Sequence, residues 1–204
     1  DELNIPQSKR IYPLASSETN HMIAAIQRPN PIKPIGLRLA AEYILNICHK
    51  NNIKPNTYEL YSCFPVAVQM FAEALHLQDN EKLTVTGGMS FAGGPLNNYM
   101  IHSTVKMLED IRSTPSKIGL ITGVSGMMTK QSFALWAKDP LINYSYKDVT
   151  SEAASIDKPK DISNLNEGKG LIIGYTILPK NSKAEEKAVM YIEDINGHRK
   201  VLIS

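Results

Sequence analysis

Two periodicities occur in this chain, and the point where one of them stops limits what it can fold into. Up to about residue 140, short runs of strand-forming residues alternate with longer runs whose apolar residues recur at helical spacing. Beyond that point only strand-like runs follow. Alternation of this kind is typical of layered α/β architecture, in which helices cover a sheet. We therefore expect an α/β domain over 1–144 and a small, mostly β domain over 145–204.

The individual elements follow from local signals. Pro34 suits a first helical position, and Asn51 and Asn52 end the apolar pattern that follows it. Asn196-Gly197 is a strong hairpin signal near the end of the chain. Helices are predicted over 34–50, 65–75 and 98–112. Strands are predicted over 58–63, 82–86, 118–122, 133–137, 171–178, 188–195 and 199–203. Residues 1–33 contain four prolines and are predicted to be connecting chain.

Composition and charge exclude several classes of function. The chain has 22 basic and 20 acidic residues, and neither sign forms a run, which argues against nucleic-acid binding. No stretch approaches the roughly 20 apolar residues of a membrane span. Two cysteines, Cys48 and Cys63, are too few for a disulfide scaffold or a structural zinc site. We expect a protein of the cytoplasm that does not span a membrane.

A glycine-rich segment at 87–95 is the first candidate for a binding site. It lacks the spacing of a dinucleotide loop and the Gly-Lys-Ser/Thr ending of a P-loop. Its glycines permit positive φ and close approach of a ligand to the backbone, while Asn97 or Asn98 would cap the following helix. That arrangement suits an anion or a thioester oxygen. The alternative is a tight turn that packs a helix against a sheet.

His102 is a candidate catalytic or ligand-orienting residue. It follows Asn98 by one helical turn, beside an apolar stripe of Ile101, Val105 and Leu108. Its neighbourhood in the sequence holds no second histidine and no carboxylate at ligand spacing, so we predict no metal site. The alternative is a structural histidine on a helix.

Cys63 is a second candidate, because it lies between Ser62 and Phe64 where a strand ends and a helix begins. The dipole of that helix would stabilise a thiolate. Alternatively, Cys63 is a small residue that fills a strand end, in which case an apolar environment would raise the pKa of its thiol.

Two segments, 59–69 and 86–99, resemble the C-terminal half of thiolases. The similarity is greatest to thiolase-like proteins that carry an additional C-terminal domain and are usually regarded as acetyl-CoA acetyltransferases. Residues 10–14 and the pair Thr129-Lys130 fit the same pattern, so the resemblance extends over essentially the whole chain.

The resemblance implies a thiolase-type half-fold, a mixed sheet layered with helices, followed by a small mostly β domain. It also implies that the reactive cysteine comes from an N-terminal half outside these residues. Gly94 stands where working thiolases have the histidine of a Gly-His-Pro motif, and Val124 where they have a second catalytic cysteine. Residues 61–64, Tyr-Ser-Cys-Phe, replace the Asn-Glu-Ala-Phe motif.

Two functions are therefore expected. The first is the C-terminal part of an acyl-CoA acyltransferase of lipid metabolism that is inactive as this chain alone; the second is a non-catalytic module that binds acyl-CoA or a partner protein. The expected ligand is a coenzyme A thioester, with no covalently bound cofactor, and the expected partner is the missing N-terminal half. The candidate catalytic residues are His102, Cys63 and Tyr61. The candidate substrate-binding residues are Ser62, Phe64, Gly87, Gly88, Gly93, Gly94, Asn97 and Asn98.

Overall fold

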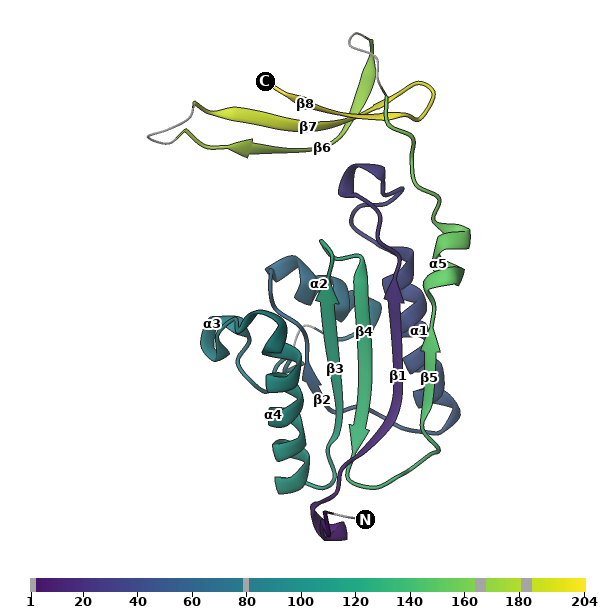
Figure 1. Cartoon of the computed structure of the whole chain (residues 1–204), viewed down its shortest axis with the longest axis vertical. Helices are drawn as coiled ribbons and strands as arrows, with labels where there is room; N and C mark the ends of the chain where they lie inside the picture. The colour runs from purple at the N-terminus through teal and green to yellow at the C-terminus, as the bar shows by residue number, and fades with distance from the viewer. Residues whose placement is uncertain (1–2, 79–80, 164–167, 181–184) are drawn as a thin grey trace. The chain divides into compact units, whose positions relative to one another are not determined.

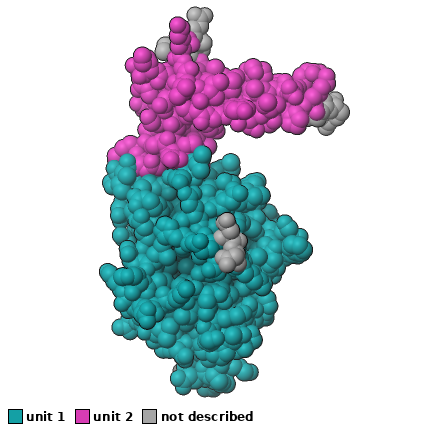
Figure 2. Space-filling model, turned by 180° about the vertical axis from the view of Figure 1, so that it is seen from behind, with its two compact units in different colours: residues 1–22, 32–156 teal, residues 23–31, 157–204 magenta. Residues whose placement is uncertain are grey.

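A computed structural model describes residues 3–78, 81–163, 168–180 and 185–204, which form two compact units. Unit 1 comprises Asp1–Met22 and Ile32–Ile156, and unit 2 comprises Ile23–Pro31 and Asp157–Ser204 (Figure 2). Each unit takes its residues from two separate stretches of the chain. No helix among the described residues is both long enough and apolar enough to cross a membrane.

The described part of unit 1 contains a five-stranded mixed sheet in the order β2-β3-β4-β1-β5 (Figure 1). Neighbouring strands pair antiparallel in β1–β4 and β3–β4, and parallel in β1–β5 and β2–β3. The strands are β1 (Tyr12–Asn20), β2 (Thr57–Glu59), β3 (Ile118–Ser125), β4 (Lys130–Ala137) and β5 (Ser145–Asp148). The prediction of an α/β fold with a mixed sheet is confirmed.

Helices α1 (Ile35–Lys50) and α2 (Pro65–Ala74) cover one face of this sheet. Alternate residues of β4 are buried because successive side chains of a strand point to opposite faces. The T-shaped contact of Phe71 with Phe133, whose ring centroids are 5.4 Å apart, joins α2 to the sheet. The core of this face also includes Leu37, Ala40, Ala41, Ile44, Met70, Leu120 and Leu135.

Helix α4 (Tyr99–Ser113) packs on the other face, where Met107 and Ile111 contact Ile121. Close approach requires a glycine on β3, since a Cβ at Gly119 would lie 2.3 Å from the Met107 sulfur. The buried stripe of α4 differs from the sequence expectation, because Ile101, Val105 and His102 are exposed. The residues that face the sheet recur every fourth position: Tyr99, Ser103, Met107 and Ile111.

The prediction of connecting chain over 1–33 was wrong for β1, a nine-residue strand inside the sheet. Pro13 is tolerated there because the β1–β4 register shifts between Pro13 and Ala15, and because the pairing of β1 with β5 begins only at Ala15. Pro13 therefore lies at a point of the β-ladder where no hydrogen bond requires the backbone N–H that proline lacks.

Other short elements also depart from the expectations. Residues 82–86 form no strand, and a one-turn helix, α3 (Met89–Ala92), lies inside the glycine segment, where no helix was predicted. A further helix, α5 (Thr150–Ile156), follows the point where helical spacing was expected to stop. Short 3₁₀ helices are η1 (Gln7–Lys9), η2 (Ala25–Gln27) and η3 (Leu96–Asn98).

Unit 2 contains a three-stranded antiparallel sheet of β6 (Gly170–Leu178), β7 (Lys187–Asp194) and β8 (Arg199–Ile203). The predicted hairpin at Asn196-Gly197 is confirmed, with Gly197 at a φ of 80°. The unit boundary lies after Ile156 rather than after residue 144. Residues 145–156 belong to unit 1 because β5 pairs with β1 and Ala153 of α5 is fully buried.

Arg199 joins the two stretches of chain that make up unit 2. It is 4% exposed, and its guanidinium donates to the backbone oxygens of Ile26, Arg28 and Pro29 and to the carboxylate of Glu193. The backbone N–H of Lys160 also donates to the oxygen of Gln27, at 2.8 Å. The segment 23–31 is thus held by charge-assisted hydrogen bonds from β8.

Candidate functional site

A buried carboxylate organises the candidate site. Glu59, at the end of β2, is 0% exposed. Its oxygens accept hydrogen bonds from the backbone N–H groups of Val85 (2.7 Å) and Thr86 (3.0 Å) and from the hydroxyls of Thr84, Thr86 and Tyr99 (each 2.8 Å). Burying a charge is costly unless hydrogen bonds satisfy it, and here five donors do so. Residues 82–86 turn around this carboxylate instead of forming the expected strand.

The glycine segment begins in this anchored turn. The N–H groups of Gly87 and Gly88 each donate to the Thr84 hydroxyl at 3.0 Å, and both glycines have positive φ, 89° and 77°. The N–H of Met89 donates to the hydroxyl of Ser62 at 2.9 Å. Ser62 thereby ties the 61–64 turn to the start of α3. The structure brings together the segments that contain Ser62, Gly87 and Gly88.

Three aromatic side chains extend from this turn along α4. The Tyr61 and Tyr99 ring centroids lie 5.3 Å apart in an edge contact, and those of Tyr99 and His102 lie 6.0 Å apart. The backbone N–H of Tyr61 is held by the Thr122 hydroxyl of β3 at 2.9 Å. His102 is exposed, rather than buried among Val105 and Leu108. It therefore lies beside the site with its imidazole accessible to a ligand.

Most of the remaining predicted binding residues lie in the exposed part of the glycine segment and just after it, and Phe64 lies in the 61–64 turn. A Cβ placed on Gly93 or Gly94 would meet no atom within 4 Å, so space is open at both positions. Asn98 is the N-terminal cap residue of α4, but its side chain makes no capping hydrogen bond, contrary to expectation. Asn97 and Phe64 are exposed.

Burial raises the pKa of each titratable group in the 61–64 turn. Desolvation raises the pKa of the Cys63 thiol, an effect opposed by backbone hydrogen bonds from Phe64 and from Cys63 itself. Desolvation likewise raises the pKa values of the Tyr61 and Tyr99 phenols. The pKa of Cys63 is thus raised rather than lowered, the direction of the alternative expectation, and Cys63 is mostly a neutral thiol near neutral pH.

Cys63 is expected to react with iodoacetamide at about pH 8 several-fold more slowly in the folded chain than in urea, because only the thiolate attacks and a raised pKa reduces its fraction. Cys48, whose pKa burial raises to about 11, serves as an internal reference and should react more slowly still. Peptide mass spectrometry after timed alkylation measures both rates. A faster reaction of Cys63 in the folded chain would instead identify an activated thiol.

The chemistry of the site does not point to a metal. Among the residues that the structure describes, no group of three or more His, Cys, Asp or Glu side chains is placed to hold an ion. The backbone N–H groups and the hydroxyls around Glu59 already donate hydrogen bonds within the site. The groups left to donate are the Tyr61 hydroxyl, the neutral Cys63 thiol and the His102 imidazole. They are suited to donating hydrogen bonds to a carbonyl or thioester oxygen.

Several solved protein chains match the architecture described above. Among them, a monomeric SCP2-thiolase-like protein type 1 from Mycobacterium smegmatis superimposes with a TM-score of 0.84 over 99% of this chain, at 21% sequence identity. The fold is thiolase-like. This chain spans only 45% of the length of that protein. No protein-family model matches the sequence, and no curated protein matches it.

Sequence reasoning missed the anchor of the candidate site. Glu59 is a charged residue in a run of apolar and aromatic residues, and it occupies the end of a strand whose three residues are all buried. An acidic residue in such a run signals a satisfied buried carboxylate. Its partners Thr84 and Tyr99 carry no comparable signal in the sequence. Threonine and tyrosine are ordinary residues of strands and helices, whether or not they bind a buried carboxylate.

Proposed function

We propose that this chain supplies one part of an acyl-coenzyme A pocket to a longer thiolase-like protein, and that alone it catalyses no thiolysis. The observation that carries the proposal is the anchored arrangement of the 61–64 turn, the glycine segment and His102. Tyr61, Cys63 and His102 can donate hydrogen bonds and lie on a thiolase-like fold, and Gly94 leaves open space in the glycine segment. A thioester oxygen is the ligand group that suits such donors.

An exposed apolar surface supports the idea that another part of a longer protein completes this pocket. Phe64, Phe91, Leu96, Ile101 and Val105, which we call the apolar belt, are each at least half exposed. They lie on or beside the segments that form the candidate site. Clustered exposed apolar residues of this kind mark interaction surfaces. The matched structure, of which this chain spans 45%, has enough additional chain to supply such a cover.

The proposed lack of thiolysis rests on the residues that replace the thiolase motifs. Gly94 provides no imidazole and Val124 no thiol, while the nucleophile would come from outside this chain. Claisen chemistry needs a base for the α-proton and donors for the developing enolate oxygen, and each contributes orders of magnitude in rate. His102, Cys63 and Tyr61 are the groups of this chain that are left to compensate.

The isolated chain is expected to give no turnover above blank in a coupled thiolysis assay with acetoacetyl-CoA and coenzyme A, because it lacks the nucleophile and both replaced groups. Isothermal titration with acetyl-CoA should be run on the same sample. Turnover that is lost in His102→Ala or Cys63→Ala, but kept in the α4 surface control Lys106→Ala, would overturn the proposal and make these residues catalytic.

The second candidate function is a non-catalytic module that binds acyl-CoA or a partner protein. The raised pKa of Cys63 favours it, since a neutral thiol is a poor nucleophile. The residue at the nucleophile position of the remaining part of the protein separates the two functions. A cysteine there keeps catalysis by the complete protein plausible, whereas an inert residue supports binding alone.

A further inference from the structure

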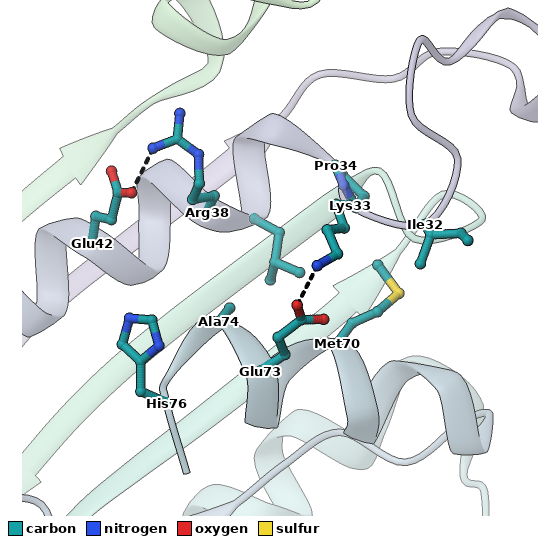
Figure 3. Close-up of a pocket in the computed structure, with 10 residues that line it drawn as sticks. Ile32, Lys33, Pro34, Arg38, Glu42, Met70, Glu73, Ala74 and His76 are labelled. Atoms are coloured by element: carbon teal, nitrogen blue, oxygen red, sulfur yellow. Dashed lines mark hydrogen bonds and ion pairs between the residues drawn. The ribbon is translucent and has the colours of Figure 1, made fainter.

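A cavity of about 310 Å³ lies between α1 and α2, and none of the candidate site residues lines it (Figure 3). Its apolar walls are formed by Ile32, Pro34, Leu37, Met70 and Ala74, and His76 and four charged residues also line it. All of these residues belong to unit 1. The volume lies at the lower end of the range of about 300–1,000 Å³ that is typical of small-molecule sites. A small ligand with an apolar body would fit these walls.

Two ion pairs lie on the rim of this cavity. Lys33 pairs with Glu73 of α2, and Arg38 pairs with Glu42 one helical turn further along α1 (Figure 3). All four side chains are roughly half exposed or more. Exposed ion pairs of this kind contribute little to stability, so either cation can change its partner at small cost.

The position of α1 adds to the attraction for an anion. The helix begins beside the cavity, its cap residue Pro34 offers no side-chain hydrogen bond, and its first turn holds no acidic residue. Lys33 and Arg38 instead lie near this end, where the helix dipole is positive and acidic groups are favoured. The cations and the dipole together favour a negatively charged ligand group at this edge of the cavity.

We propose that the α1–α2 cavity binds a small amphiphilic carboxylate, such as a medium-chain fatty acid. Its apolar chain lies against Leu37, Met70 and Ala74, and its carboxylate takes over Lys33 or Arg38 from the present acidic partner. The unbranched side chain of Met70 adapts to chains of different shape. The site is separate from the proposed acyl-CoA pocket and does not depend on it.

Octanoate titrated into the ¹⁵N-labelled 204-residue chain is expected to bind saturably, with a Kd on the order of 0.1–1 mM for a ligand of this size. The amide shifts should be confined to 32–42 and 70–77. Octanol tests the apolar walls alone, and acetate tests the head group alone. We expect octanol to bind roughly tenfold more weakly, and acetate to produce no saturable shift in the same range.

Variants test the cations and the apolar walls of the proposed site separately. Lys33→Gln combined with Arg38→Gln should bring the affinity for octanoate down to that for octanol, whereas Ala74→Leu, which fills the cavity, should weaken both ligands. The control Lys106→Gln removes a partly exposed, ion-paired lysine on α4 and should change neither. Equal affinities of the unmodified chain for octanoate and octanol, shifts located elsewhere, or no saturation would each overturn the proposal.

Discussion

Replacing Glu59 by alanine is expected to lower the free energy of unfolding by about 3–5 kcal/mol, one of the largest effects of any single substitution in this chain. The change leaves the N–H of Val85 without its acceptor, and the N–H of Thr86 and the Tyr99 hydroxyl each lose one of two partners. Unsatisfied buried donors keep the full cost of their desolvation. Urea denaturation followed by the fluorescence of Trp136, the one tryptophan, reports on unit 1 directly.

Two matched variants test whether the acceptor role of Glu59 explains the loss. Glu59→Gln should cost less, because its amide N–H groups can donate to the Thr86 and Tyr99 hydroxyls while the remaining oxygen still accepts from the backbone. Glu109→Ala removes an exposed carboxylate from α4 and should change stability by no more than about 0.5 kcal/mol. A loss below about 1 kcal/mol for Glu59→Ala would show that water replaces the carboxylate.

Arg199→Ala is expected to destabilise unit 2 by about 3 kcal/mol, since it removes the guanidinium that holds three backbone oxygens of 23–31. Hydrogen exchange read by mass spectrometry should show faster exchange in 23–31 and β8, with β1 to β4 unchanged. The loss is larger than for a surface arginine because this side chain is 4% exposed.

Arg199→Lys is expected to behave almost like the alanine variant, because a single ammonium cannot reproduce the planar fork of donors. Lys187→Ala, on the exposed start of β7, is the control and should leave the exchange pattern unchanged. If Arg199→Lys kept full protection of 23–31, charge alone rather than the geometry of the fork would be holding this segment.

The sequence predicted the long helices well and the short or unusual strands poorly. Helices α1 and α2 carry apolar residues at regular spacing between clear start and stop signals, so their bounds were nearly correct. Strand β1 was missed because Pro13 reads as a breaker, and only the register shift next to it makes proline acceptable. Residues 82–86 have strand propensity, but the Glu59 carboxylate takes two of their N–H groups.

The candidate site was predicted in its segments but not in its internal contacts. The 61–64 turn and the glycine segment were each singled out from the sequence, and the hydrogen bond from the Met89 N–H to the Ser62 hydroxyl connects them, although no strand precedes the glycine segment. The roles of these residues remain predictions. Helix α4 has apolar residues on two stripes, and the sequence could not show that the stripe through Met107 packs on the sheet while that of Ile101 and Val105 stays exposed.

Unit 2 is built from two separate stretches of the chain, so it can fold only after the second stretch has been synthesised. Residues 23–31 leave the ribosome long before β8, and until Arg199 follows them their carbonyl oxygens lack the donors that hold them in the folded chain. Unit 1, by contrast, is complete once α5 has emerged. Because domains form as their residues emerge, a ribosome stalled ahead of Arg199 would carry a finished first unit and no second one.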